Sequence, residues 1–214
     1  MAGGCVNLLP DACAKQLAVS RETLDRLKTY VSLLQHWNPR INLVGRNSLD
    51  DVWRRHILDS GQLAALAPPG RPWIDLGSGA GLPGLILAIM RAGPMHLVEA
   101  DARKCAFLRE AARLTGTDVT IHNGRIETVT AELAAQTPAL ITARALAPLP
   151  KLLPLVHAMA GSNTMVLLPK GRDVEVELTE TSKSWNMRVQ RHPSLSDPDG
   201  RILQIEGLSR VECD

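Results

Sequence analysis

Cysteine, aromatic residues and long apolar runs are all scarce in this 214-residue sequence. The four cysteines, Cys5, Cys13, Cys105 and Cys213, form no CxxC pair and have no histidine at ligand spacing, which argues against a disulfide framework and against a zinc site. The longest apolar stretch, residues 85–90, is far too short to cross a bilayer, and no basic stretch precedes a hydrophobic run at the N-terminus. We therefore expect a cytoplasmic protein with reduced thiols and no bound metal.

The shortage of aromatic residues and of net charge limits how the chain could bind RNA. One Phe, one Tyr and four Trp are too few for a surface that stacks several bases on exposed rings. The net charge is only +2, and the excess lies in residues 1–66, which hold eight basic and six acidic side chains. Four of these basic residues, Arg40, Arg46, Arg54 and Arg55, lie close together in the sequence, which fits either an ordinary solvated face or a patch that contacts phosphates.

The composition is that of a globular protein, with 45% hydrophobic and 21% charged residues. The length allows one domain, or one domain with a small appendage. The hydrophobic pattern changes once, near Pro68-Pro69-Gly70. We predict an N-terminal helical extension over residues 1–66 and a second unit over residues 67–214.

The extension is predicted to hold two helices. Apolar residues recur at helical spacing over residues 17–34, with Ser20 in the N-cap position. A break is expected at Asn38-Pro39. Capping-box spacing at Ser48 predicts that a second helix begins there and runs to residue 58.

From residue 71 onward, short apolar runs alternate with longer amphipathic segments. Such alternation predicts an α/β fold with a mostly parallel, doubly wound sheet and right-handed crossovers. After a further helix over residues 173–184, a turn-rich segment separates residues 185–191 from residues 201–206, which predicts a C-terminal antiparallel hairpin. The predicted strands of the parallel part are residues 73–76, 95–100, 119–122, 139–144 and 164–168, and the helices are residues 82–91, 102–115, 126–135 and 149–159.

Residues 74–84, with the sequence IDLGSGAGLPG, run from a hydrophobic strand through a glycine-rich turn into a helix. Ligands bind at such a turn because the carboxyl end of the strand meets an exposed helix N-terminus. Gly77, Gly79 and Gly81 let the backbone turn tightly and approach a bound nucleoside where a Cβ would collide. The GxGxG spacing favours an S-adenosylmethionine loop over a dinucleotide fingerprint, although Gly84 keeps the NAD alternative open.

Glu99 ends the second predicted strand, 24 residues after Asp75. An acidic side chain at that position can accept both hydrogen bonds from the 2′,3′-diol of a ribose, in NAD and in S-adenosylmethionine alike. The glycine turn, with Asp75 before it and Glu99 after it, therefore predicts adenosine binding.

Four more residues follow strands at the same edge of the predicted sheet. Ile126 could lie on the face of an adenine ring, and Glu127 is either an acid favoured by the helix dipole or a ligand contact. Arg144 could contact a substrate phosphate, a cofactor carboxylate or a neighbouring acid. Lys170 could be an electrostatic clamp or part of a solvated loop.

Missing motifs narrow the chemistry. No Asp/Asn-Pro-Pro-Tyr/Phe follows residues 139–144, which disfavours methylation of an adenine amino group. No cysteine lies on the loops after the fourth and fifth predicted strands, so the covalent addition used in pyrimidine C5 methylation has no nucleophile. Cys105 is expected to be a buried small apolar side chain, and His56 is expected to pack within its helix rather than act as a base.

Six short motifs along the chain are specific enough to compare with a known family. They are LQHWN at residues 34–38, INLV at 41–44, RHILDS at 55–60, DLGSGAGLPG at 75–84, RA at 144–145 and LPKG at 168–171. Together they resemble the ribosomal RNA small-subunit methyltransferase G family, also called glucose-inhibited division protein B. The resemblance covers about residues 17–206. It implies a Rossmann-like class I S-adenosylmethionine-dependent methyltransferase that methylates N7 of one guanosine in 16S ribosomal RNA.

The resemblance also implies which residues bind the cofactor, while the RNA contacts are expected from positive charge at the carboxyl edge and on the N-terminal helices. Guanine N7 carries a lone pair and no proton, so its methylation needs alignment rather than a general base, and Arg144 is the one side chain considered for a catalytic contribution. Glu99 stands where many members carry Asp, which keeps the hydrogen-bond acceptor. The expected cofactor contacts are Gly77, Gly79, Gly81, Leu82, Glu99, Ile126, Glu127 and Arg144. The residues expected to hold RNA phosphates are Arg54, Arg55, Arg103, Lys104 and Lys170.

The fold alone does not decide the substrate, so two other function classes remain beside the RNA enzyme. One is a methyltransferase or NAD-linked enzyme that acts on a small molecule, and the other is a non-catalytic adenosine-binding module. For the RNA enzyme we expect a monomer that acts on 16S ribosomal RNA in the small ribosomal subunit or in an assembly intermediate.

Overall fold

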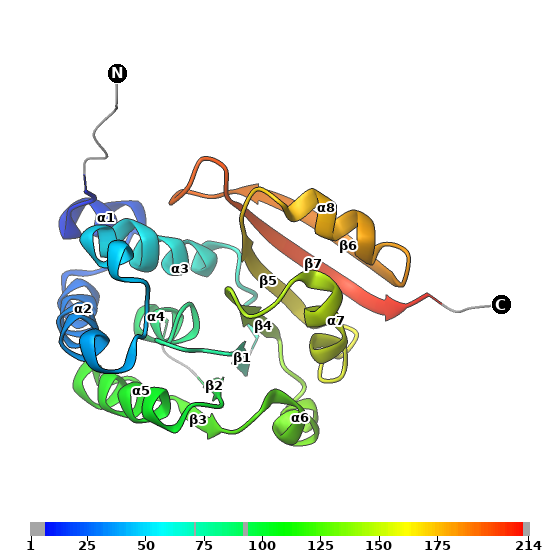
Figure 1. The fold of residues 1–214 in the computed structure, drawn as a ribbon, viewed down its shortest axis with the longest axis horizontal. Helices are drawn as coiled ribbons and strands as arrows, with labels where there is room; N and C mark the ends of the chain where they lie inside the picture. Colours follow the sequence, from blue (N-terminus) through cyan, green and yellow to red (C-terminus); the bar gives the residue numbers. More distant parts are fainter. Residues whose placement is uncertain (1–6, 71, 92–93, 212–214) are drawn as a thin grey trace.

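A computed structural model describes residues 7–70, 72–91 and 94–211, which form a seven-stranded sheet between layers of helices (Figure 1). The strand order is β3-β2-β1-β4-β5-β7-β6, in which β1 to β5 are parallel and β7 and β6 form an antiparallel edge. The predicted α/β class, parallel sheet and C-terminal hairpin are therefore confirmed. The strands are β1 (Trp73–Leu76), β2 (Met95–Glu99), β3 (Thr120–Asn123), β4 (Leu140–Ala143), β5 (Met165–Lys170), β6 (Trp185–Pro193) and β7 (Arg201–Arg210).

Helices cover both faces of the sheet. Side chains along the strands alternate between two buried clusters: Trp73 of β1 belongs to the cluster under α4 and α5, and Ile74 belongs to the cluster under α6, α7 and α8. Burial on both faces explains why the strands of the parallel part read as continuous apolar runs. The helices are α4 (Gly84–Met90), α5 (Ala102–Thr115), α6 (Ile126–Ala135), α7 (Leu149–His157) and α8 (Val174–Thr181).

The N-terminal segment packs outside α4 and α5. The ring of Tyr30 meets Phe107 edge-on with centroids 6.1 Å apart, and its hydroxyl donates to the carbonyl of Ala80 in the glycine turn over 2.7 Å. The extension thus shares one core with the sheet, and the division at residue 66 stays a prediction. Its elements are α1 (Pro10–Gln16), α2 (Arg21–Ile41), the 3-10 helix η1 (Arg46–Asp51), the π-helix η2 (Trp53–Leu58), α3 (Asp59–Gly61) and the 3-10 helix η3 (Gln62–Ala65).

Helix α2 continues past the expected break. Ser20 is its N-cap, as predicted, and accepts from the backbone N–H of Thr23. The predicted break at Asn38-Pro39 is wrong because Pro39 lies in the last turn, where it removes only one backbone hydrogen bond. The buried side chain of Asn38 then closes the helix end, since its Nδ2 donates to the carbonyl of Val44 and its Oδ1 accepts from the N–H of Val44.

The segment after α2 also differs from prediction. Ser48 does not cap a helix: it lies inside η1, and its hydroxyl donates to the carbonyl of Gly45. The helix that follows is π-helical over η2, and the short helix α1 was not predicted at all. Both strands of the hairpin extend beyond their predicted ends, to Pro193 and Arg210.

Cys13 and Cys105 are buried free thiols, and Cys105 packs as a small core side chain as predicted. Cys5 and Cys213 lie outside the described residues. Within the described ranges, no helix combines the length and apolar character needed to span a bilayer.

Candidate functional site

The glycine-rich turn after β1 lies at the carboxyl edge of the sheet, beside the point where the strand order reverses between β1 and β4. Gly77 has a φ of 65°, in the left-handed region that favours glycine, and a Cβ there would come within 2.6 Å of Cδ1 of Leu146. The N–H of Ser78 donates to the carbonyl of Val98, which fastens the turn to β2. The turn therefore presents backbone, not side chains, to the space at this edge.

A cavity of about 640 Å³ opens beside the turn, and we call it the first cavity. Its walls are the glycine turn, the carboxyl ends of β2 and β3, and the loop over residues 145–147 that follows β4. Both predicted adenosine elements, the turn and the acidic residue after β2, thus face one space. Predicted cofactor contacts that line it are Gly77, Gly79, Glu99, Ile126 and Glu127.

Glu99 holds the first cavity together. Its Oε2 accepts from the N–H of Gly79 and its Oε1 accepts from the N–H of Asp101, each over 2.8 Å. Only 9% of the residue is exposed. A buried carboxylate fixed by two backbone donors is a preorganised acceptor, and its remaining lone pairs can accept further hydrogen bonds.

Three predicted cofactor contacts lie elsewhere. Gly81 packs against Leu85 and Leu108, where a Cβ would come within 2.7 Å of Leu85 Cβ, and Leu82 is buried in the core with 4% exposure. Arg144 lies at the end of β4 and faces a different space. Cofactor contact at Gly81, Leu82 and Arg144 stays a prediction of the family resemblance.

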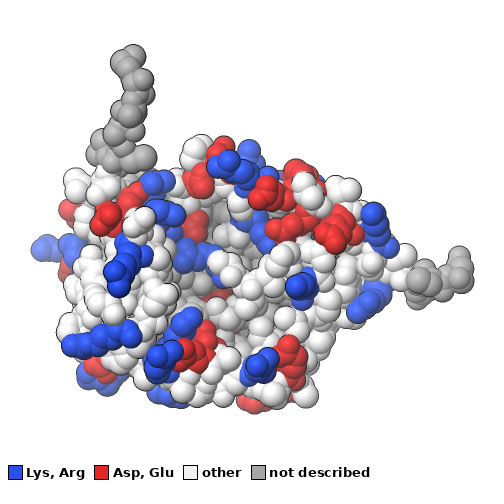
Figure 2. Space-filling model, in the orientation of Figure 1, with Lys and Arg blue, Asp and Glu red and all other residues white. Residues whose placement is uncertain are grey.

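A second cavity of about 510 Å³ lies between the ends of β4 and β5 and the loop that joins β6 to β7. Arg144, Lys170 and Arg201 line it together with acidic side chains such as Asp59. The loop over residues 145–147 lines both cavities, so the two spaces adjoin at the carboxyl end of β4. Figure 2 shows Lys and Arg interspersed with Asp and Glu on this face of the molecule.

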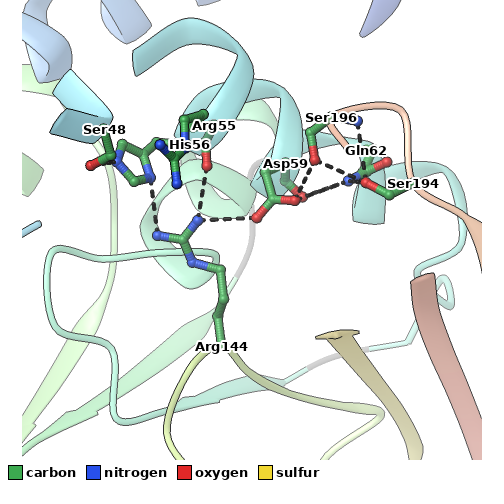
Figure 3. A network of polar contacts seen from close by, with 8 residues as sticks. All are labelled: Ser48, Arg55, His56, Asp59, Gln62, Arg144, Ser194 and Ser196. Carbon is green, nitrogen blue, oxygen red and sulfur yellow. Dashed lines mark hydrogen bonds and ion pairs between the residues drawn. The ribbon is translucent and has the colours of Figure 1, made fainter. Parts of the chain in front are cut away.

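Arg144 is held by the N-terminal extension (Figure 3). Its Nη1 donates to the carbonyl of Arg55 over 3.1 Å and to Oδ2 of Asp59 over 3.0 Å, and its Nη2 contacts Nδ1 of His56 over 3.2 Å. Asp59 is thus the neighbouring acid that the sequence suggested as one partner of Arg144. Asp59 was not singled out from the sequence, although it lies within the RHILDS motif.

His56 packs inside the extension, as expected, with 6% of the residue exposed. Its Nε2 lies 2.8 Å from the hydroxyl of Ser48. Burial and the neighbouring Arg144 and Arg55 charges lower the pKa of His56 to about 3, so the ring is neutral at physiological pH.

The basic residues predicted to bind RNA have different surroundings. Arg54 pairs with Asp51 and also donates to the carbonyl of Ser196, whereas Arg55 is exposed. Exposed Arg103 pairs with Asp101. Lys104 lines the first cavity. Lys170, in the second cavity, donates to Glu177 Oε2 over 2.8 Å.

Asp75 carries a carboxylate buried at the end of β1. Its Oδ1 accepts from the hydroxyl of Thr142 over 2.7 Å, while its Oδ2 has no hydrogen-bond partner among the described residues. Burial raises the pKa of Asp75 to about 6 despite the Thr142 hydrogen bond, because the charged form is poorly solvated there.

This raised pKa predicts a pH-dependent stability. Folded Asp75 keeps a proton between pH 3.8 and about 6 that the unfolded chain releases, so the free energy of unfolding falls as pH rises through this window and then levels. The difference of about two pKa units corresponds to about 3 kcal/mol. We expect Asp75→Asn to lack this component when urea unfolding is measured at pH 4.5 and pH 7.5. Equal changes in wild type and variant would contradict the assignment.

Comparison with known proteins places these features in a family. The model of a family described as rRNA small subunit methyltransferase G matches residues 23–202. A ribosomal RNA small subunit methyltransferase G from Rhodospirillum centenum is 52% identical over 193 residues, which cover 89% of this chain and 87% of the relative. One from Paramagnetospirillum magneticum is 51% identical over 202 residues, or 94% and 97% of the two chains.

Solved structures share the fold at much lower identity. A putative O-methyltransferase from Klebsiella pneumoniae aligns with a TM-score of 0.62 at 17% identity, over 92% of this chain and 96% of that one. A mutant of MtNAS in complex with S-adenosylmethionine aligns with a TM-score of 0.59 at 16% identity, over 94% of this chain and 84% of that one.

Among the described residues, no group of three or more His, Cys, Asp or Glu side chains is arranged so that it could hold a metal ion.

Proposed function

Because this chain belongs to the rRNA small subunit methyltransferase G family, we propose that it transfers a methyl group from S-adenosylmethionine to N7 of one guanosine in 16S ribosomal RNA. The observation that carries the proposal is the pair of cavities that adjoin at residues 145–147. One cavity has the features of a nucleoside cofactor site, and the other leaves room for a nucleotide beside it.

The first cavity fits S-adenosylmethionine. Gly77 and Gly79 present backbone atoms to the cavity, and a Cβ at Gly77 would collide with Leu146. Glu99 is a fixed carboxylate that would accept hydrogen bonds from a ribose diol. Ile126, at the start of α6, is an apolar wall of the kind that packs on an adenine ring. The resident cofactor would supply an electrophilic methyl group on a positively charged sulfur.

The reaction requires alignment rather than proton transfer. The N7 lone pair forms the new C–N bond as the C–S bond breaks, and positive charge passes from sulfur to the base. No proton leaves N7, so the residues described here need only bind the two reactants in line and exclude water. The site agrees with this chemistry: buried Asp75 is not among the lining residues of either cavity, and His56 is engaged in the extension.

We assign RNA phosphate contacts to Arg54, Arg55, Arg103, Lys104 and Lys170. The support is their position. Lys104 and Lys170 line the first and second cavities, and Arg54 and Arg55 line a smaller hollow that shares Asp59 and Asp197 with the second cavity. Arg103 lies in the first turn of α5, which follows the carboxyl end of β2. Phosphate contacts of this kind fix the position of the RNA and weaken with salt. The substrate is the small ribosomal subunit or an assembly intermediate. We further propose that the protein acts as a monomer in the cytoplasm, where small ribosomal subunits are assembled.

The proposal predicts a single methylated guanosine. The purified protein would be incubated with tritiated-methyl S-adenosylmethionine and small ribosomal subunits from a strain deleted for its own gene. We expect label in one guanosine of 16S RNA, mapped by cleavage at N7-methylguanosine, and no label in subunits from the undeleted strain. If S-adenosylhomocysteine binds but no RNA is labelled, the RNA substrate is refuted and a small-molecule methyltransferase takes its place.

The same assay tests the RNA contacts when charge is reversed at Arg55, which is exposed and makes no side-chain ion pair in the described chain. Arg55→Glu is expected to lower kcat/KM for subunits by about five- to tenfold at low salt, with a smaller difference at high salt. Arg113→Glu is the control for position, because Arg113 is also exposed but pairs with Glu110 in the last turn of α5, at the opposite edge of the sheet. Equal effects of the two variants would remove Arg55 from the RNA surface.

A further inference from the structure

We propose that His56 and Asp59 are positioning residues that hold Arg144 with one edge of its guanidinium free to bind an oxyanion beside the two cavities. The proposal deepens the proposed function and rests on it, because the oxyanion is supplied by one of the two reactants. His56 and Asp59 act through Arg144 in this proposal.

The hydrogen bonds of Arg144 leave a defined edge open. Both hydrogens of Nη1 are used, one toward the carbonyl of Arg55 and one toward Asp59, and one hydrogen of Nη2 is used toward His56. The Nε hydrogen and the second Nη2 hydrogen have no partner among the described residues. These two hydrogens lie side by side on the same edge, and they form the fork that binds a carboxylate or phosphate in bidentate fashion.

The contact with His56 fixes the protonation state of the ring. Arg144 can only donate, so Nδ1 of His56 must accept, and the ring proton must lie on Nε2. Nε2 then donates to the hydroxyl of Ser48, and this hydroxyl donates to the carbonyl of Gly45. The chain of donors is consistent from end to end, and the low pKa of His56 keeps it so at physiological pH.

Asp59 connects Arg144 to a third part of the chain. While its Oδ2 accepts from Arg144, its Oδ1 accepts from the hydroxyl of Ser196 over 2.6 Å, in the loop between β6 and β7. Nearby, Gln62 Oε1 accepts from the N–H of Leu195 over 2.7 Å. Arg144 is therefore fixed by the extension, and the extension is itself hydrogen-bonded to the loop between β6 and β7 (Figure 3).

Such fixing matters because an arginine side chain otherwise samples many rotamers. A mobile arginine loses conformational entropy when it binds an anion, whereas a side chain that is already fixed does not bear this cost on binding. The anion has two possible sources with the same chemistry: the methionine carboxylate of the cofactor, or a phosphate of the RNA. Arg144 lines the second cavity and is followed at once by the loop shared with the first.

The test compares His56→Leu with His56→Asn. The two side chains have nearly the same shape and both lose the contact with Ser48, but Asn keeps an oxygen near the place of Nδ1. We expect His56→Leu and Asp59→Asn to weaken binding of the anion to Arg144 by about tenfold, seen as a higher dissociation constant of S-adenosylhomocysteine or a higher KM for small subunits. His56→Asn should restore most of the loss caused by His56→Leu. Glu110→Gln, which removes an exposed ion pair with Arg113 far from the cavities, is the control and should change nothing.

Three readouts are needed. The first is rotation about the Nε–Cζ bond of Arg144, followed by NMR of the labelled guanidinium, which should be slow in wild type and faster in His56→Leu and Asp59→Asn. The second is the dissociation constant of S-adenosylhomocysteine by calorimetry, which rises if the anion is the cofactor carboxylate. The third is KM for small subunits, which rises alone if the anion is an RNA phosphate.

The outcomes separate this proposal from the proposed function. Unchanged guanidinium rotation in both variants overturns the positioning role, whatever the substrate. Faster rotation with unchanged S-adenosylhomocysteine binding and unchanged KM and kcat overturns the role of Arg144 as an anion clamp. A wild-type protein that binds S-adenosylhomocysteine but labels no RNA refutes the RNA substrate, while rotation and cofactor binding still decide the role of His56 and Asp59.

Discussion

Replacing Glu99 with alanine is expected to raise the dissociation constant of S-adenosylhomocysteine by about two to three orders of magnitude. The variant would lack the carboxylate that accepts both hydrogen bonds from the ribose diol, and a hydrogen bond to a charged group contributes about 1.5–3 kcal/mol. The variant also leaves the N–H groups of Gly79 and Asp101 without their acceptor, which loosens the wall of the first cavity. Calorimetric titration of the purified variant with S-adenosylhomocysteine measures the effect directly.

Two further variants show whether the carboxylate itself is responsible. Glu99→Asp keeps a carboxylate and is expected to stay within about tenfold of wild type, since only its reach is shorter. Glu127→Ala removes an exposed acid at the same cavity and should have a smaller effect than Glu99→Ala. If Glu99→Ala bound S-adenosylhomocysteine as tightly as wild type, the first cavity would not be the adenosine site.

Gly84→Ala is expected to destabilise the protein by about 3 kcal/mol, at the upper end of the cost of overpacking a core. A Cβ at Gly84 would lie 2.5 Å from Cβ of Asp75 and 2.7 Å from Cδ2 of Leu97. Neither neighbour can move far, because β1 and β2 are central strands. Helix propensity alone would favour alanine by about 1 kcal/mol, so the contact with β1 has to outweigh it.

Thermal unfolding checks this expectation. For a chain of this size, 3 kcal/mol corresponds to a decrease in Tm of roughly 6–12 °C. Gly171→Ala is the matched control, since nothing lies within 4 Å of a Cβ at that position, and its Tm should stay close to that of wild type. A Gly84→Ala protein as stable as the control would mean that α4 can move away from the sheet without cost.

Sequence patterns predicted the sheet well because its signals are local. Each parallel strand is a short apolar run between turns, and burial on both faces leaves little ambiguity, as at Ile74 and Leu76. The extension was predicted less well. Pro39 usually ends a helix, but here Asn38 completes the end of α2 through contacts with a residue outside the helix, and no propensity reports such a contact.

The candidate site divides in the same way. Glu99 and the glycine turn were found because both adjoin the carboxyl ends of strands that short apolar runs locate in the sequence. The partner of Arg144 was not found, since Asp59 lies 85 positions away and in a different structural layer. RHILDS indicated that the segment was specific to the family, but only the folded chain shows that its acid faces the end of β4.

The hydrogen bond between Ser196 and Asp59 also determines the order in which the two cavities can form during synthesis. Asp59 and Arg144 both leave the ribosome before the loop that carries Ser196 is made, because Ser196 follows them in the sequence. A nascent chain can therefore form the parallel strands and the first cavity before the second cavity has its outer wall. The loop between β6 and β7 has to be synthesised before both cavities are complete, so a chain truncated before Ser196 would leave Asp59 with Arg144 and Gln62 as partners but without the Ser196 hydroxyl.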